Sequence, residues 1–303
     1  MPQIREACRS AEPAVRIAGL KALGARGDIA NVALLLADRA ARTSGDEQAA
    51  ARASLRVLRG KDVHATMIGR MKEADAAVQG ELVQALADRG ATEATPVLLQ
   101  MAAGNEASVR VASYRALREL AGAGEVERLV ALLAGAPREE QKQLETVILG
   151  VARRTDAAAR TAQAILARLD SVPDTPRKGT MIGILGQLGD ASALATLRRA
   201  LNDADVEIRS AAIVGLGHWP DVTPLPDLLQ VVRDDKNLAH RVLALRGYID
   251  LVGRADSMNA EEKVQCCRTA LGLAPNAAEK RRVFAVLTNV KTVESLQLAA
   301  SGV

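Results

Sequence analysis

The feature that most constrains this chain is a helical-hairpin pattern that recurs along almost its whole length. Its clearest copy is residues 205–229, DVEIRSAAIVGLGHWPDVTPLPDLL. Asp205 suits a helix N-cap, and apolar residues then recur at helical spacing up to Leu216. Pro220 predicts the end of this helix, and Pro224 fits the first turn of a second, Leu-rich helix. Two such amphipathic helices cannot bury their apolar faces alone, so the pattern predicts a stack of similar hairpins.

An anchor column, aligned on Leu216, tests the repeat along the chain. Its nine members are separated by 28–39 residues, the spacing expected of a helix–turn–helix repeat. Eleven residues before the anchor, eight of nine positions are acidic or Asn, as helix starts should be; seven before it, seven of nine are basic. The members of the anchor column are Leu23, Leu58, Leu86, Leu117, Leu149, Leu185, Leu216, Tyr248 and Leu287.

The repeat predicts one continuous solenoid over residues 1–303. The two prolines of SVPDTPRKG indicate a kink near 171–178, and a domain boundary there is the alternative. Neither end supplies a clear polar capping helix, so we expect the chain to be a segment of a longer protein. The predicted units lie near 12–42, 46–73, 75–103, 106–134, 137–170, 174–202, 205–234, 237–274 and 276–303.

The composition agrees with thin layers of small side chains. Apolar residues make up 49% of the chain but aromatic residues only 1%, which fits stacked helices better than a bulky core. Residues 1–150 hold 20 basic and 19 acidic side chains and the rest hold 20 and 17, so neither half forms a basic block for nucleic acid. No apolar run is long enough for membrane insertion, and no signal peptide is visible. We therefore expect a cytoplasmic protein, with a periplasmic or secreted location open if the chain is a fragment.

The first helix and the turn after it follow the pattern acid-x-x-[VI]-R-x-x-A-A-x-x-[AG]-L-G-x-x-x-D. It is best kept in residues 205–221, 12–28 and 179–190. This pattern resembles the HEAT repeat, in the bacterial HEAT-like form also seen in phycobilisome-lyase-type proteins. The resemblance implies an all-α, right-handed α-α superhelix, an armadillo-like solenoid of about nine helical hairpins. It also implies that the second helices line a concave face.

The resemblance further implies a ladder in which a turn Asp of one unit faces a helix cation of the next. The middle units lack the turn Asp, which leaves the ladder incomplete there. The implied members are Asp28, Asp62, Asp190, Asp221, Arg16, Arg110, Lys178, Arg209, Arg241 and Lys280.

Nothing in the sequence predicts catalysis, a metal site or a cofactor. The histidines His64, His218 and His240 lie in different units, and none is followed by Glu as in HEAT-like iron enzymes. No nucleophile elbow, phosphate-binding Gly loop or CxxC pair occurs. Glycines are expected at helix ends, where they serve as C-caps. Trp219, beside Pro220, is expected to pack an inter-helix turn, and a partly exposed anchor for a partner is the alternative.

A protein–protein interaction scaffold is the function that this pattern favours, with another protein or adjacent domains of a longer chain as the partner. On the concave face we expect five exposed binding residues: Gln100, Arg128, Arg198, Arg199 and Gln230. The alternative is nucleic-acid binding by second-helix arginines, against which acidic neighbours and the lack of stacking aromatics count. Those arginines include Arg39, Arg70, Arg128, Arg160, Arg198, Arg199, Arg233 and Arg268.

Overall fold

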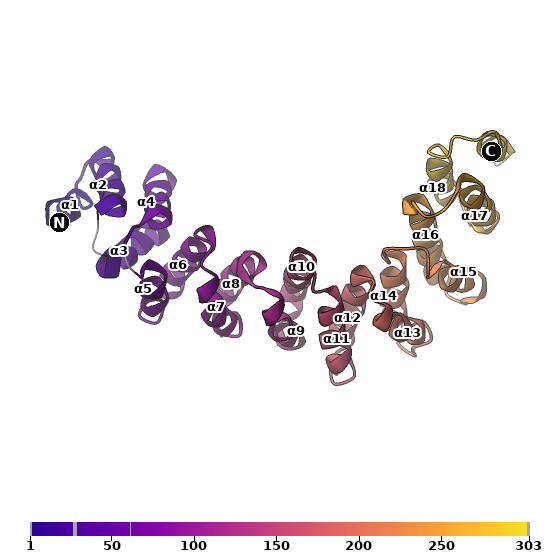
Figure 1. Ribbon diagram of the computed structural model, residues 1–303, viewed down its shortest axis with the longest axis horizontal. Helices are drawn as coiled ribbons and strands as arrows, with labels where there is room; N and C mark the ends of the chain where they lie inside the picture. The colour runs from indigo at the N-terminus through magenta and orange to yellow at the C-terminus, as the bar shows by residue number, and fades with distance from the viewer. Residues whose placement is uncertain (1, 27–28, 61, 302–303) are drawn as a thin grey trace. The chain divides into compact units, whose positions relative to one another are not determined.

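The computed structural model describes residues 2–26, 29–60 and 62–301, and all regular elements in these ranges are helices (Figure 1). In chain order they are α1 (Pro2–Ala7), α2 (Pro13–Arg26), α3 (Ile29–Arg42), α4 (Gly45–Val57), α5 (Val63–Met71), α6 (Ala76–Asp88), the 3₁₀ helix η1 (Thr92–Ala94), α7 (Thr95–Ala102), α8 (Ala107–Leu120), the 3₁₀ helix η2 (Ala123–Glu125), α9 (Val126–Gly135), α10 (Arg138–Arg154), α11 (Ala158–Leu169), α12 (Thr175–Leu188), α13 (Ala191–Ala200), α14 (Val206–Gly217), α15 (Leu225–Asp234), α16 (Leu238–Arg254), α17 (Ala260–Leu273), α18 (Ala277–Leu287) and α19 (Val293–Ser301).

From α2 on, the described helices pair into nine hairpins, with even-numbered first helices and odd-numbered second helices. First helices pack on the next first helix, as α2 does on α4 and α12 does on α14. Second helices pack on the first helix that follows, as α3 does on α4 and α15 does on α16. Where these contacts occur, a hairpin buries its apolar stripe against its neighbour in sequence, and the all-α solenoid of hairpins is confirmed.

The chain forms two compact units. The first takes in the residues up to Leu132 together with Thr146–Val151, and the second takes in Leu133–Glu145 together with the residues from Ala152 on. Helix α10 thus contributes residues to both units. Within the second unit α11 contacts α13 across residues 171–178; the single solenoid and the kink at that segment stay predictions.

The anchor column lies in the core. All nine members are at most 6% exposed. Four of the predicted helix starts cap as expected: the side chains of Asp75, Asp205, Asn237 and Asn276 accept hydrogen bonds from first-turn amides. Asp174 is the N-cap residue of α12, but its side chain makes no capping hydrogen bond. The four caps satisfy N–H groups that the helix itself cannot pair.

The register predicted for the second hairpin is wrong by three residues. Helix α4 has Ser44 at its N-cap, and Glu47 lies inside its first turn. Leu58 is the C-cap residue of α4, whereas Leu55, eleven residues after Ser44, takes the anchor position. Both leucines are buried, at 0% for Leu55 and 1% for Leu58, so hydrophobicity alone could not distinguish the two registers.

The glycines do more than cap helices. Gly189 follows α12 with φ of +65°, as a C-cap glycine does. In contrast, Gly186 lies inside α12 opposite Gly215 of α14, and an added Cβ on Gly186 would stand 2.2 Å from the Gly215 Cα. Gly217 and Gly247 form a similar pair between α14 and α16, at 2.9 Å. These pairs let the backbones of successive first helices approach closely, a role beyond the C-capping that the sequence predicted for glycines.

Within the described ranges, no helix has both the length and the apolar character that crossing a bilayer requires.

Candidate interaction surface

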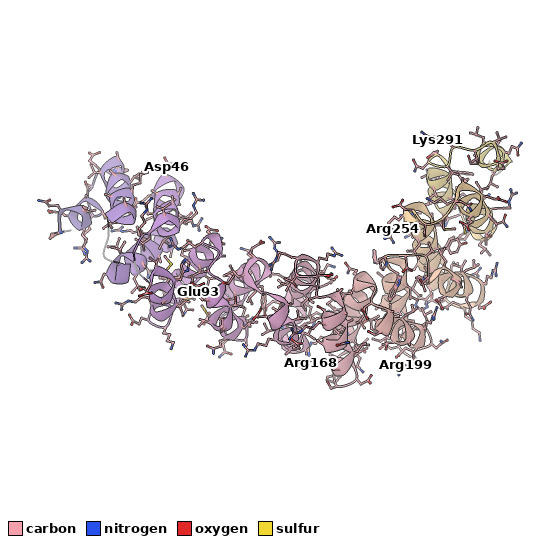
Figure 2. All side chains as sticks on the ribbon, viewed as in Figure 1. Asp46, Glu93, Arg168, Arg199, Arg254 and Lys291 are labelled. Atoms are coloured by element: carbon pink, nitrogen blue, oxygen red, sulfur yellow. The ribbon has the colours of Figure 1, made fainter. Side chains whose placement is uncertain are left out.

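The five predicted binding residues all lie on second helices with exposed side chains. Gln100 is on α7 and Arg128 is on α9, in the first unit. Arg198 and Arg199 are on α13 and Gln230 is on α15, in the second unit, and Figure 2 labels Arg199 at α13. The structure therefore places three of the five on two successive hairpins, which we call the α13–α15 surface.

Arg198 joins the two helices of this surface. Its guanidinium donates two hydrogen bonds to the Asp227 carboxylate of α15, from Nε to Oδ1 at 2.9 Å and from Nη2 to Oδ2 at 3.0 Å. This two-point geometry is the strong form of an arginine–carboxylate pair. The positive charge of Arg198 is thus largely balanced by Asp227 of the same chain. The sequence alone could not show this pairing.

Beside this ion pair lies a cavity of about 330 Å³. Its walls carry four carboxylates and one guanidinium, so its charge is negative and it suits a cation or an N–H donor. Gln230 lines it, at the exposed rim. The lining residues are Leu201, Asn202, Asp203, Arg209, Asp227, Gln230, Val231, Asp234 and Asp235.

The carboxylates of the cavity are held by local bonds. Asp203 accepts from the amide of Asp205 at 2.8 Å, and Asp235 accepts from the amide of Asn237 at 2.7 Å. Burial acts to raise the pKa of Asp235, but the Asn237 amide and the His240 ring outweigh it and hold this pKa below its ordinary value. Asp235 is therefore ionised at neutral pH and keeps the cavity negative.

His240 connects this acidic cavity to α14. Its Nδ1 lies 3.0 Å from Asp235 Oδ2 and its Nε2 lies 3.1 Å from Ser210 Oγ, the hydrogen-bond order of a Ser–His–Asp triad. Ser210, however, sits within α14, where the backbone amides bond to the helix carbonyls and cannot form an oxyanion hole. Its hydroxyl also donates to the Val206 carbonyl at 2.9 Å. The buried His240 therefore acts as a polar clamp between α14 and α16.

Trp219 is not an exposed anchor. Its side chain is only 2% exposed, in the turn after α14, and its amide donates to the Leu216 carbonyl at 3.2 Å. Pro220 packs against Gly189 of the preceding hairpin. The structure thus corrects the anchor alternative and leaves the turn-packing interpretation, because the indole fills the space that the turn encloses.

The implied Asp–Arg ladder is replaced by local capping. Asp190 and Asp221 accept from amides two residues ahead, at 3.0 and 2.7 Å. Arg209 donates to the carbonyls of Asp203 and Ala204 in the loop after α13, and Arg241 donates to the Val232 carbonyl in the last turn of α15, so both cations bind backbone ahead of their own helix. Asp28 lies outside the described residues.

Cross-hairpin ion pairs do occur, between different residues. Arg16 of α2 contacts Glu47 of α4 at 2.9 Å, and Arg246 of α16 contacts Glu279 of α18 at 2.6 Å. In both pairs the glutamate is almost buried, at 12% and 1% side-chain exposure. A cation on one first helix and a glutamate near the start of the next is thus a recurring junction.

The described residues contain no group of three or more His, Cys, Asp or Glu side chains arranged to hold a metal ion. His64 faces Glu93 at 2.5 Å and His240 faces Asp235, so two of the three histidines have carboxylate partners. His218 is exposed in the turn after α14.

Comparison with known proteins agrees with this fold. Residues 162–246 match the model of the HEAT-repeat family. Among solved structures, the crystal structure of Kap121p is similar over 98% of this chain, with a TM-score of 0.64 and 10% sequence identity. The chain spans only 38% of the length of that protein, and at this identity the likeness shows the fold alone.

The complex of CpcE and CpcF of phycocyanin lyase from Nostoc sp. PCC7120 aligns over 90% of this chain and 94% of that one, at 16% identity. Its TM-score of 0.35 is too low to carry an argument. No curated protein sequence matches the chain.

The stack of helical hairpins makes the fold an α-solenoid, and its second helices present a polar surface. Residues 162–246 are thus HEAT repeats by the family match, and the hairpins of the other described residues share the solenoid fold.

Proposed function

We propose that this chain is a non-catalytic protein–protein interaction scaffold that contacts its partner through the α13–α15 surface. The main support for this proposal is that Arg198 and Asp227 of this surface form an ion pair with each other, while the cavity beside them is lined mainly by carboxylates. Such a mixed surface suits a protein partner that offers lysine, arginine or amide donors. The partner is another protein or an adjacent domain of a longer chain.

The geometry favours protein over nucleic acid. Arg70 is engaged by Glu73 and Arg198 by Asp227. A phosphate backbone needs a row of cations whose counterions can be released. The α13–α15 surface offers instead a cavity in which four carboxylates outnumber one guanidinium, and this repels phosphate.

The proposal is tested by capture of partners from the source cells on the immobilised full chain, followed by binding measurements with each purified candidate. The surface variant is Arg199→Glu with Gln230→Lys. The matched control is Arg153→Glu, because Arg153 is an exposed arginine in the last turn of α10, as Arg199 is in α13.

We expect a partner that binds the wild-type chain and the Arg153→Glu control but loses at least about tenfold in affinity for the surface variant. Equal binding by all three proteins would remove the α13–α15 surface as the contact. Retention of nucleic acid with a steep loss between low and high salt would support the nucleic-acid alternative instead.

A further inference from the structure

A second polar cavity lies among the first helices α14, α16 and α18, within the second compact unit. Its volume is about 520 Å³. It shares no lining residue with the acidic cavity beside the α13–α15 surface. Its polar lining residues are His218, Asp250, Arg254, Arg282 and Asn289.

This cavity is not the stacking face of the last hairpin. The α18 residues that line it include Arg282, Ala285 and Val286, which recur at three- and four-residue spacing and so share one side of the helix. That side faces α16, because a Cβ added to Gly253 of α16 would stand 3.2 Å from Val286 Cγ2. Helix α16 contacts α14 as well as α18. By the same rule a further first helix would take the other side of α18 and would leave this cavity open.

Arg254, the last residue of α16, is held across the contact with α14. Its Nη2 donates to the Gly217 carbonyl at 2.8 Å, and its Nε donates to the Asp250 carbonyl at 3.3 Å. Within the described residues, Nη1 makes no hydrogen bond. The guanidinium therefore lines the cavity in a fixed orientation and keeps a donor for an anion, which lowers the entropy cost of binding one.

Arg282 provides a second guanidinium to the same cavity. Its Nη1 lies 4.0 Å from Asp250 Oδ1 and its Nε lies 3.7 Å from Glu279 Oε2, and both distances exceed those of a hydrogen bond. Glu279 is already bound by Arg246 at 2.6 Å. Arg282 can therefore form a short, two-point bond with an incoming carboxylate that its own fold does not supply.

A smaller cavity of about 210 Å³ adjoins the first and extends its positive charge. The two cavities share Gly253, Val286 and Asn289 in their walls. The smaller one is also lined by Lys263 of α17 and by Lys291, which Figure 2 labels after α18. Neither lysine has an ion-pair partner among the described residues. Together the two cavities, which we call the α14–α18 pocket, present four cations against one carboxylate.

We propose that the α14–α18 pocket binds an acidic segment of a partner protein. One carboxylate of the segment lies between Arg254 and Arg282, and a second lies beside the two lysines. The apolar lining formed by Ile249, Ala285 and Val286 receives the aliphatic part of the segment.

The lining of the α14–α18 pocket favours protein carboxylates over nucleic acid. Its cations stand in two small cavities rather than in a row, and no aromatic side chain lines either cavity for base stacking. The α14–α18 pocket is positive and shares no residue with the α13–α15 surface, so each of the two proposals can fail without the other.

The probe is a fluorescein-labelled hexaglutamate peptide, whose binding to the full chain is followed by fluorescence anisotropy at low salt. Arg282→Gln should weaken binding about fivefold, because it removes one guanidinium and keeps a polar side chain of similar length. Arg281→Gln is the matched control: Arg281 is the neighbouring exposed arginine of α18, lines neither cavity and donates to the Ala277 carbonyl. The control changes the net charge equally and should lose less than about twofold.

A second pair of variants tests the cavity itself. Ala285→Trp fills the larger cavity without a change of charge and should remove most of the binding. Ala278→Trp, at an exposed alanine of α18 outside both cavities, should bind as the wild type does. Both alanines are exposed, so an unchanged circular dichroism spectrum separates loss of binding from loss of fold.

Three results with the peptide would overturn the proposal: no saturable binding, equal losses for Arg282→Gln and Arg281→Gln, or full binding by Ala285→Trp. A labelled hexathymidylate oligonucleotide is the second probe. Tighter binding of the oligonucleotide than of the peptide, with the same dependence on Arg282, would also overturn it, because the pocket would then prefer phosphate to carboxylate.

Discussion

The pair formed by Gly186 and Gly215 yields a quantitative test of how the hairpins are held together. We consider Gly186→Ala on α12. The new Cβ would stand 2.2, 2.3 and 2.4 Å from the Cα, carbonyl O and carbonyl C of Gly215, where carbon atoms normally stay about 3.5–4.0 Å apart. All three atoms belong to the backbone of α14, so no flexible side chain can move aside. The two helices would have to separate by about 1.5 Å at this point.

The free-energy cost follows from two opposing effects. Overpacking of a well-packed core costs about 1–3 kcal/mol, and a contact with backbone belongs at the upper end of this range. Alanine in a helix interior regains about 1 kcal/mol relative to glycine. We therefore expect Gly186→Ala to lower the free energy of unfolding of the α12–α14 region by about 2 kcal/mol.

Gly183 provides a matched control three residues earlier on the same helix. A Cβ added there meets no heavy atom within 4 Å, so Gly183→Ala should raise the free energy of unfolding by about 0.5–1 kcal/mol. The same Gly→Ala substitution on one helix should therefore lower the free energy of unfolding at position 186 and raise it at position 183. Urea denaturation gives the order of the midpoints, and hydrogen exchange read by mass spectrometry places the change on α12 and α14. A Gly186→Ala protein as stable as Gly183→Ala, or faster exchange elsewhere only, would refute the close-approach reasoning.

Three further predictions concern polar groups. Arg246→Met should cost about 2 kcal/mol in urea denaturation, because it leaves the buried Glu279 carboxylate with only the longer 3.7 Å contact to Arg282, whereas Glu279→Gln should cost only about 1 kcal/mol because Arg246 is half-exposed to water. Asn276→Ala should cost about 1 kcal/mol by removing the N-cap of α18, while Asn276→Asp should retain the cap. The ionised state of Asp235 is favoured in the fold, so its contribution to stability is present above its ordinary pKa and is lost as pH falls through the lowered one; melting curves of the wild type should therefore fall more steeply below about pH 4 than those of Asp235→Asn. Loss of His240 should reduce this difference without abolishing it, because the Asn237 amide still donates to Asp235. An identical pH dependence of wild type and Asp235→Asn would contradict the prediction.

The buried columns were predictable because the same positions must be apolar in each of the nine hairpins. An anchor such as Leu185 or Leu216 must be apolar in every copy, and the helix starts must offer an acceptor, so errors at single positions average out. The second hairpin shows the limit of this method. Leu55 and Leu58 are both apolar and both buried, and only the position of the Ser44 cap distinguishes the anchor from the residue after the helix.

The partners of the charged side chains were not predictable from the column in which they stand. Arg16 and Arg209 share one column, and both donate to the carbonyls six and five residues before them, yet among the described contacts only Arg16 also has a carboxylate partner, Glu47. A long cation reaches several acceptors of similar energy, and the choice depends on distances of an ångström or less. The same reason kept the Arg198–Asp227 pair, and hence the negative cavity beside it, out of the sequence prediction.

The glycine pairs follow from the way in which the hairpins stack. Stacking successive first helices closely removes apolar surface from water over their whole length, and Gly186 with Gly215 permits an approach that even an alanine at that point would prevent. The same stacking means that each hairpin leaves a face which only its neighbour can cover. A substitution that forces two first helices apart, such as Gly186→Ala, therefore destabilises the hairpins on both sides of the junction and not only the helix that carries it.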